Sequence, residues 1–250
     1  MTTSSTHPLV LLLVAIILGS SSAAAALAQE ATPTAEGVTV LPPGELVDGA
    51  SIGEWSARHW QWTTSFPVKV NPGHDVTGAR CGYGQSGLVF FIPRNFAPCT
   101  VPAGMALFVP IVGTECSTAE PPPYGGRTGA ELRACAAADV DRYTGIVVRV
   151  DGQEVPDIQT YRVSSPLFTL VLPDANVLGA SAGPAHAVAD GYQIMLAPLP
   201  VGDHEIMVHL ELMDGTVLPD KIARITVVAP PVASPVATPD FGTPVATPIT

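Results

Sequence analysis

The chemically richest stretch of the chain is its first predicted helix, between residues 51 and 66. It contains all three tryptophans of the sequence, Trp55, Trp60 and Trp62. Helical spacing places the first and the third of these on one face with His59 and Phe66, and we expect that face to dock onto the protein body and bury apolar area. Trp60 points elsewhere. With His59 and Gln61 it could line a groove that stacks on a sugar ring or an apolar ligand.

Carboxylates form the second group of candidates. Glycosidases hold two carboxyl groups across a cleft, and five residues have the required chemistry: Glu115, Glu120, Asp139, Asp141 and Asp190. The sequence does not bring any two of them together, so it names no catalytic residue. A hydrolase of envelope polymers would draw first on Glu115, Asp190 and His59. The candidate ligand-binding residues are therefore His59, Trp60, Gln61, Glu115 and Asp190.

Two motif-like segments fail on geometry. The run from His204 to His209 resembles the H-E-x-x-H zinc-protease helix, but the histidines lie five residues apart in a strand-like segment and so point to opposite faces. His209 and Glu211 share the outer face, and such a pair is more often solvated than bound to a metal. The G-x-G-x-x-G stretch at 82–87 precedes a predicted strand rather than a helix, which argues against a dinucleotide site. We predict no metal and no cofactor.

Four cysteines lie in the middle of the chain: Cys81, Cys99, Cys116 and Cys135. In an exported protein an even number of cysteines predicts disulfides. Three pairings are possible, and separations of 18 and 19 residues favour the sequential one, Cys81–Cys99 and Cys116–Cys135. Zinc binding would require C-x-x-C pairs, which the chain lacks.

The first 28 residues predict export. An apolar run from Pro8 to Leu18 precedes the small-residue cleavage pattern Ala26-Leu27-Ala28. No Lys or Arg precedes the run, and Pro8 to Ala28 is long enough to span a bilayer, so an uncleaved anchor is the alternative. No membrane insertion is expected unless this segment stays uncleaved. We therefore expect an extracellular or cell-surface location.

The rest of the chain divides into three parts. Residues 29–44 form a loose polar lead-in, 45–228 a folded domain, and 229–250 a Pro/Ala/Thr-rich disordered tail. The tail is either a flexible spacer or a glycosylated or wall-embedded stalk. The formal net charge is -11, so nothing attracts a phosphate backbone and no nucleic-acid partner is expected.

The sequence patterns of the folded part predict a mainly β domain. Capping boxes at Ser51–Glu54 and Thr128–Glu131 predict two helices. The segments 88–92 and 167–172 are continuous apolar runs, typical of strands covered on both faces, whereas 145–150, 192–196, 204–213 and the stretch ending at Val228 alternate. Many short strands with frequent turn signals predict an antiparallel β-sandwich with two capping helices.

Several segments together resemble a family of exported bacterial proteins without an assigned function. The match covers most of residues 52–228 and rests on these motifs: Trp55-x4-Trp60-x-Trp62; Cys81-Gly82-x-Gly84-Gln85-Ser86-Gly87; Cys99-Thr100-Val101-Pro102-Ala103-Gly104-x-Ala106-Leu107-Phe108-x-Pro110-Ile111; Ser165-Pro166-Leu167-Phe168; and Ala189-Asp190-Gly191-Tyr192. The resemblance implies export and a single domain, and it transfers no catalytic residue.

These observations favour a secreted or cell-surface binding module without catalytic activity. Carbohydrate or a cell-wall polymer is the first expectation for its ligand. An envelope-polymer hydrolase and a purely structural envelope protein are the alternatives. Exposed aromatic rings in a shallow groove would favour the first, and convergent carboxylates in a deep pocket would favour the second.

Overall fold

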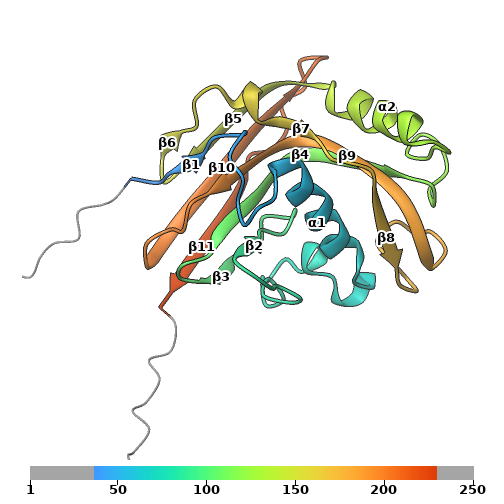
Figure 1. Ribbon diagram of the computed structural model, residues 1–250. Coiled ribbons are helices and arrows are strands. Elements are labelled where there is room, and N and C mark those ends of the chain that lie inside the picture. The colour runs from blue at the N-terminus through green and yellow to red at the C-terminus, as the bar shows by residue number, and fades with distance from the viewer. Residues whose placement is uncertain (1–36, 230–250) are drawn as a thin grey trace, which may run out of the picture. The chain divides into compact units, whose positions relative to one another are not determined.

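The computed structural model describes residues 37–229, which form a mainly β domain with two α-helices (Figure 1). The expected leader, residues 29–36 of the lead-in and the tail from residue 230 lie outside the described residues. Within 37–229 no helix is long and apolar enough to cross a membrane.

The first sheet is built around two long strands, β4 (Ala106–Ser117) and β9 (Gly183–Leu196), which pair antiparallel along most of their length. Its other strands are short and flank this pair: β1 (Val40–Leu41), β2 (Val89–Phe91), β7 (Arg162–Ser164) and β8 (Phe168–Leu172). The strand β8 alternates between buried and exposed residues, so the expectation that it is covered on both faces is wrong, whereas β2 is buried throughout.

The second sheet has the order β3-β11-β10-β5-β6. Its strands are β3 (Cys99–Pro102), β5 (Tyr143–Val150), β6 (Gln153–Glu154), β10 (Gly202–Leu212) and β11 (Lys221–Val228). The expectation of purely antiparallel sheets is wrong for two pairs, because β2 runs parallel to β4 and β3 runs parallel to β11. The chain leaves the first sheet after β2, forms β3 in the second sheet and reverses into β4, so β2 and β4 point the same way.

The main core lies between the two sheets. Alternate residues of β10, Ile206, Val208 and Leu210, point inward and meet β4 residues such as Leu107 and Val109. This is the face that the alternation in 204–213 predicted. The opposite face of β10 is more exposed, and a groove lies against it.

Helix α1 (Ile52–Thr64) and helix α2 (Gly129–Val140) both begin with the expected capping boxes. Both pack on the long β4–β9 pair, and Figure 1 shows them on opposite sides of it. Three short 3-10 helices complete the elements: η1 (Val68–Val70), η2 (Pro72–His74) and η3 (Ile158–Tyr161).

The predicted disulfide pairing is confirmed. Cys81 is bonded to Cys99 and Cys116 to Cys135, with Cα–Cα distances of 5.6 and 6.2 Å. The first bond ties the loop before β2 to the start of β3, and the second ties the end of β4 to α2. Each closes a loop that the chain-entropy model values at about 3 kcal/mol.

Candidate functional site

The helix face with Trp55 and Trp62 docks inward, as the spacing predicts. Their indole N–H groups donate to the carbonyl oxygens of Val47 and Tyr83, at 2.9 and 2.8 Å. Trp60 is also only 8% exposed, and the guanidinium of Arg94 lies 4.2 Å from its ring centroid. No tryptophan therefore offers an open ring face, and a stacking platform for sugars is not formed by these side chains in this conformation.

The neighbours of Trp60 on α1 have structural contacts. His59 is 1% exposed, and its ring centroid lies 5.2 Å from that of Phe108 and 5.5 Å from that of Phe91. Burial, helped by the nearby charge of Arg94, lowers the pKa of His59 to about 3. This imidazole is neutral and part of the core. Gln61 is exposed and donates to the carbonyl oxygen of Thr169 at 2.9 Å, which ties α1 to β8.

Asp190 is buried in an ion pair. It accepts from Nε of Arg162 at 2.8 Å, and the same guanidinium donates to Asp141 at 2.7 Å and to the Ala137 carbonyl at 3.2 Å. The contact joins β7 and β9 to the end of α2. Because a carboxylate in such a pair already has its hydrogen-bond donor, Asp190 is best explained as a structural residue.

Glu115 is 4% exposed and faces Glu120 rather than Asp190. Burial raises the pKa of Glu115 well above its usual value, and the charge and hydrogen bond of Glu120 raise it further. Glu120 in turn accepts from Oγ of Ser117 at 2.9 Å. Cross-strand pairing puts Asp190 opposite Thr114, one position from Glu115, so Glu115 and Asp190 point to opposite faces of the sheet. The structure therefore does not bring the five candidate ligand-binding residues, His59, Trp60, Gln61, Glu115 and Asp190, into one site.

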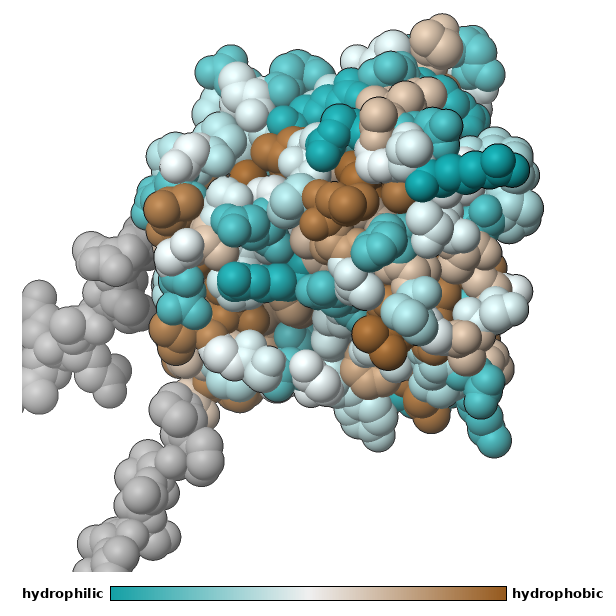
Figure 2. Space-filling model, turned by 45° about the vertical axis from the view of Figure 1, so that its right-hand side comes forward, coloured by the Kyte–Doolittle hydropathy of each residue, from teal (hydrophilic) through white to brown (hydrophobic). Residues whose placement is uncertain are grey.

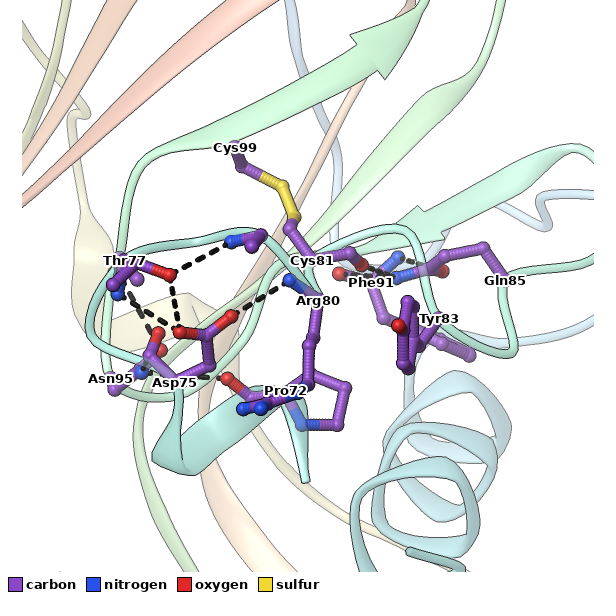
Figure 3. Close-up of a disulfide and its surroundings, with 12 residues drawn as sticks. Pro72, Asp75, Thr77, Arg80, Cys81, Tyr83, Gln85, Phe91, Asn95 and Cys99 are labelled. Carbon is purple, nitrogen blue, oxygen red and sulfur yellow. Dashed lines mark hydrogen bonds between the residues drawn. A yellow bond between two sulfur atoms is a disulfide. The ribbon is translucent and has the colours of Figure 1, made fainter. Parts of the chain in front are cut away.

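A polar loop that sequence reasoning passed over is held rigidly beside the Cys81–Cys99 disulfide (Figure 3). Asp75 accepts from the backbone N–H and the hydroxyl of Thr77, at 3.0 and 2.6 Å, and from the N–H of Arg80 at 2.8 Å. These hydrogen bonds lower the pKa of Asp75, so its carboxylate stays charged. Asn95 adds a bond to the Asp75 carbonyl at 3.0 Å. The loop is therefore fixed before any ligand arrives.

Glycine allows this loop to approach β3 closely. Gly78 has a φ of +77°, and a Cβ there would collide with the carbonyl oxygen of Pro98. The approach leaves a groove of about 760 Å³ between the loop and the outer face of the second sheet. Its walls come from the loop, β3, β10, β11 and the turn after β5, and its polar side chains are Thr77, Thr100, Asp151, Asp203, His204, Glu205, Arg224 and Thr226.

Four side chains of this groove are held in place by hydrogen bonds: Asp151, Asp203, His204 and Thr226. Asp151 accepts from the Glu205 N–H at 2.8 Å and lies 2.7 Å from Nδ1 of His204. Nε2 of His204 lies 2.9 Å from the Pro200 carbonyl, so both ring nitrogens face acceptors. Burial lowers the pKa of His204, but the bonds to Asp151 and Pro200 outweigh it and raise the pKa overall. Thr226 donates to Asp203 at 2.8 Å.

The groove therefore offers hydrogen-bond acceptors, several of them held in place, and one exposed donor, Arg224. Among residues 37–229 no group of three or more His, Cys, Asp and Glu side chains could hold a metal ion. Sequence reasoning missed the groove because its residues come from five distant segments. The one local signal was the alternation of β10, which assigned Glu205 to the outer face.

The exposed apolar residues of the surface do not mark a further site. On the face seen in Figure 2, hydrophobic residues form small separate patches among polar ones. Exposed large side chains such as Val76, Val171 and Met213 belong to different segments of the chain. Scattered apolar residues of this kind are ordinary for a protein surface.

No protein-family model and no curated protein matches the chain. Among solved structures, a cysteine protease inhibitor from Entamoeba histolytica is 11% identical, with 56% of this chain and 94% of that chain covered and a TM-score of 0.23. Amebosin is 12% identical, with 58% and 100% covered and a TM-score of 0.21. The SrpA adhesin from Streptococcus sanguinis is 12% identical, with 52% and 54% covered and a TM-score of 0.19. Scores this low carry no argument about fold or function.

Proposed function

We propose that this chain is a secreted or cell-surface β-sandwich module that binds a hydroxyl-rich ligand, carbohydrate or a cell-envelope polymer, without catalysing a reaction. The observation that carries the proposal is the groove against the outer face of the second sheet. Its volume of about 760 Å³ falls within the range of ligand sites, about 300–1,000 Å³.

The chemistry of the groove suits hydroxyl groups. A sugar hydroxyl both donates and accepts hydrogen bonds, so its site must present both kinds of partner. Asp203 and Glu205 accept and Arg224 donates, while Thr226, whose hydroxyl proton goes to Asp203, can still accept. The Arg224 Nε lies 4.0 Å from Glu205, which is long enough for the guanidinium to keep N–H groups available to a ligand.

Export is proposed on separate grounds. Two disulfides are typical of an oxidising compartment. The predicted leader and the resemblance to exported bacterial proteins point the same way. The net charge of -11 makes nucleic acid an improbable partner.

The test is binding of the full exported chain to an array of bacterial envelope glycans and N-acetylglucosamine oligomers, followed by calorimetry on the ligands retained. Arg224→Ala should weaken binding at least tenfold, since a hydrogen bond to a charged group contributes about 1.5–3 kcal/mol. Arg149→Ala is the matched control: Arg149 lies on the same outer face and pairs with Glu154 at 2.8 Å, but does not line the groove. Equal weakening by both variants, or no retained glycan, would contradict the proposal.

A hydrolase of envelope polymers is the second candidate, favoured by one observation. Burial and the neighbouring Glu120 raise the pKa of Glu115 well above its usual value, so this carboxyl pair can hold a proton near neutral pH, as a general acid must. Glu115 is almost fully buried, so only Glu120 can reach a substrate from the adjoining cavity of about 480 Å³. Release of reducing sugar from the same glycans, lost in Glu120→Gln but not in Arg224→Ala, would favour this candidate over the binding module.

A further inference from the structure

We propose a second site, separate from the groove, that binds a small carboxylate with an apolar body. It is a cavity of about 320 Å³ between α1, the loop at η2, the segment after β2 and the loop after β8. Its lining residues are Trp60, Thr63, Asn71, Gly73, His74, Arg94, Asn95, Val177 and Leu178.

The first argument is the unpaired charge of Arg94. Its guanidinium is half-buried on the Trp60 ring, and Nη2 donates to the Gly113 carbonyl at 2.6 Å. No carboxylate among residues 37–229 lies within 4.0 Å of it. Burial lowers the pKa of Arg94 to about 10, so the group is still cationic at neutral pH. A guanidinium has five N–H donors, and most of those on Arg94 have no protein partner in this part of the chain.

The nearby acids do not pair directly with this charge. The charges of Glu115 and Asp139 raise the pKa of Arg94, but burial raises the pKa of Glu115 itself well above its usual value, which weakens its contribution. After burial, Arg94 is the second cause that lowers the pKa of His59 and of Lys221. The positive charge of Arg94 is therefore felt by its surroundings, although these acids compensate it in part. Although the chain as a whole is anionic, distant charges are screened beyond about 8 Å at physiological salt.

The second argument is the donor and acceptor inventory of the cavity. The amides of Asn71 and Asn95 are occupied, because each donates to and accepts from the backbone of the surrounding loops. Thr63 is only 8% exposed, and its hydroxyl has no hydrogen-bond partner. Because that oxygen has almost no exposed surface, a ligand in the cavity could reach it only if neighbouring side chains moved. The available groups are then the Arg94 guanidinium and the imidazole of His74.

The remaining walls decide the rest of the ligand. Trp60, Val177 and Leu178 present apolar surface to the same cavity. A planar carboxylate matches the fork of an Arg guanidinium with two parallel hydrogen bonds. An apolar body beyond that carboxylate would bury the hydrophobic wall. This combination favours a monocarboxylate over free phosphate, which has no apolar part.

The test compares benzoate with benzamide, which has nearly the same shape and no charge, on the full exported chain. Benzoate should bind saturably with a Kd below about 1 mM, and benzamide and inorganic phosphate should each bind at least tenfold more weakly. Arg94→Gln should abolish benzoate binding. Arg58→Gln is the matched control, because Arg58 also stacks on an indole, 4.4 Å from the Trp55 ring centroid, but does not line the cavity.

A measurement on the unmodified chain keeps the proposal testable if the Arg94 variant does not fold. Benzoate should shift the indole N–H resonance of Trp60, assigned with Trp60→Phe. The resonances of Trp55 and Trp62 should move little, because their N–H groups are bonded to Val47 and Tyr83. Equal affinity for benzoate and benzamide, benzoate binding retained in Arg94→Gln, or an unmoved Trp60 resonance would overturn the proposal. Because none of these readouts involves the groove, the glycan proposal can fail or succeed separately.

Discussion

Lowering the pH from 7 to 2 should cost this domain about 5 kcal/mol of stability through His59 alone. Burial among aromatic rings lowers the pKa of His59 from 6.5 to about 3 in the native state, whereas the unfolded chain keeps the ordinary value. Between these two pKa values the unfolded state therefore binds a proton at His59 that the native state does not bind. Stability is fully present above pH 6.5 and is lost as the pH falls toward 3. At ~1.36 kcal/mol per pKa unit, this difference corresponds to about 5 kcal/mol.

Urea denaturation of the wild type and of His59→Leu at pH 7 and pH 4 measures this cost. Leucine has a similar volume and a good helix propensity, and it does not titrate. Between these two pH values the wild type should lose about 3 kcal/mol more than the variant, because most of the shift falls in that interval. His186→Leu is a control for changing an exposed histidine.

The comparison does not depend on the absolute stability of the variant, because only the change with pH is used. If the free energies of unfolding of wild type and His59→Leu fell in parallel with pH, His59 would have to be protonated in the native state. Burial would then not control the pKa of His59, and the reasoning would be refuted.

Two further predictions concern groups whose native pKa is raised. His204 binds its proton more tightly in the folded chain than in the unfolded chain. Its contribution to the free energy of unfolding is therefore fully present below pH 6.5 and is lost as the pH rises through the folded pKa. The variant His204→Asn should flatten the decline in melting temperature between pH 6 and pH 9. For Glu115 the sign gives a cost: the native chain holds a proton that the unfolded chain releases above pH 4.5. Glu115→Gln should therefore raise the free energy of unfolding at pH 7, and by more at pH 8, in denaturant titrations; a lower stability at both pH values would contradict the assignment.

The parts of the fold that sequence could predict are those with local causes. Ser51 and Thr128 begin helices because each is followed three residues later by a glutamate that completes a capping box. The inward and outward faces of β10 follow from alternation alone. The parallel pairs β2–β4 and β3–β11 could not be predicted, because the choice depends on which sheet the chain enters after β2 and not on any residue within the strands.

The candidate residues show a second limit of sequence reasoning. Three candidates have side chains suited to catalysis or ligand binding, yet each is held by contacts inside the domain. His59 packs against aromatic rings, Trp60 against the Arg94 guanidinium, and Asp190 pairs with Arg162. Side-chain type reveals what a residue can do, while its exposure depends on long-range packing. Arg94 was overlooked for the converse reason, since nothing in its neighbours along the chain predicts that Trp60 will lie beneath it.

Both proposed sites depend on one segment, the loop around Asp75. Asn71, Gly73 and His74 line the carboxylate cavity, and residues 77–79 line the groove. Asp75 and the Cys81–Cys99 disulfide hold the loop between these two sets of residues. Replacing both of these cysteines with serine should therefore weaken benzoate and glycan binding together.

The second disulfide supplies a matched control for this effect. Cys116–Cys135 closes a loop of nearly the same length, 19 residues against 18, so its loss should destabilise the domain by a similar amount, about 3 kcal/mol. It borders neither cavity. At a temperature where both double variants are folded by circular dichroism, only the Cys81/Cys99 variant should lose binding. Equal losses in the two variants would mean that general stability, and not the fixed loop, governs ligand binding.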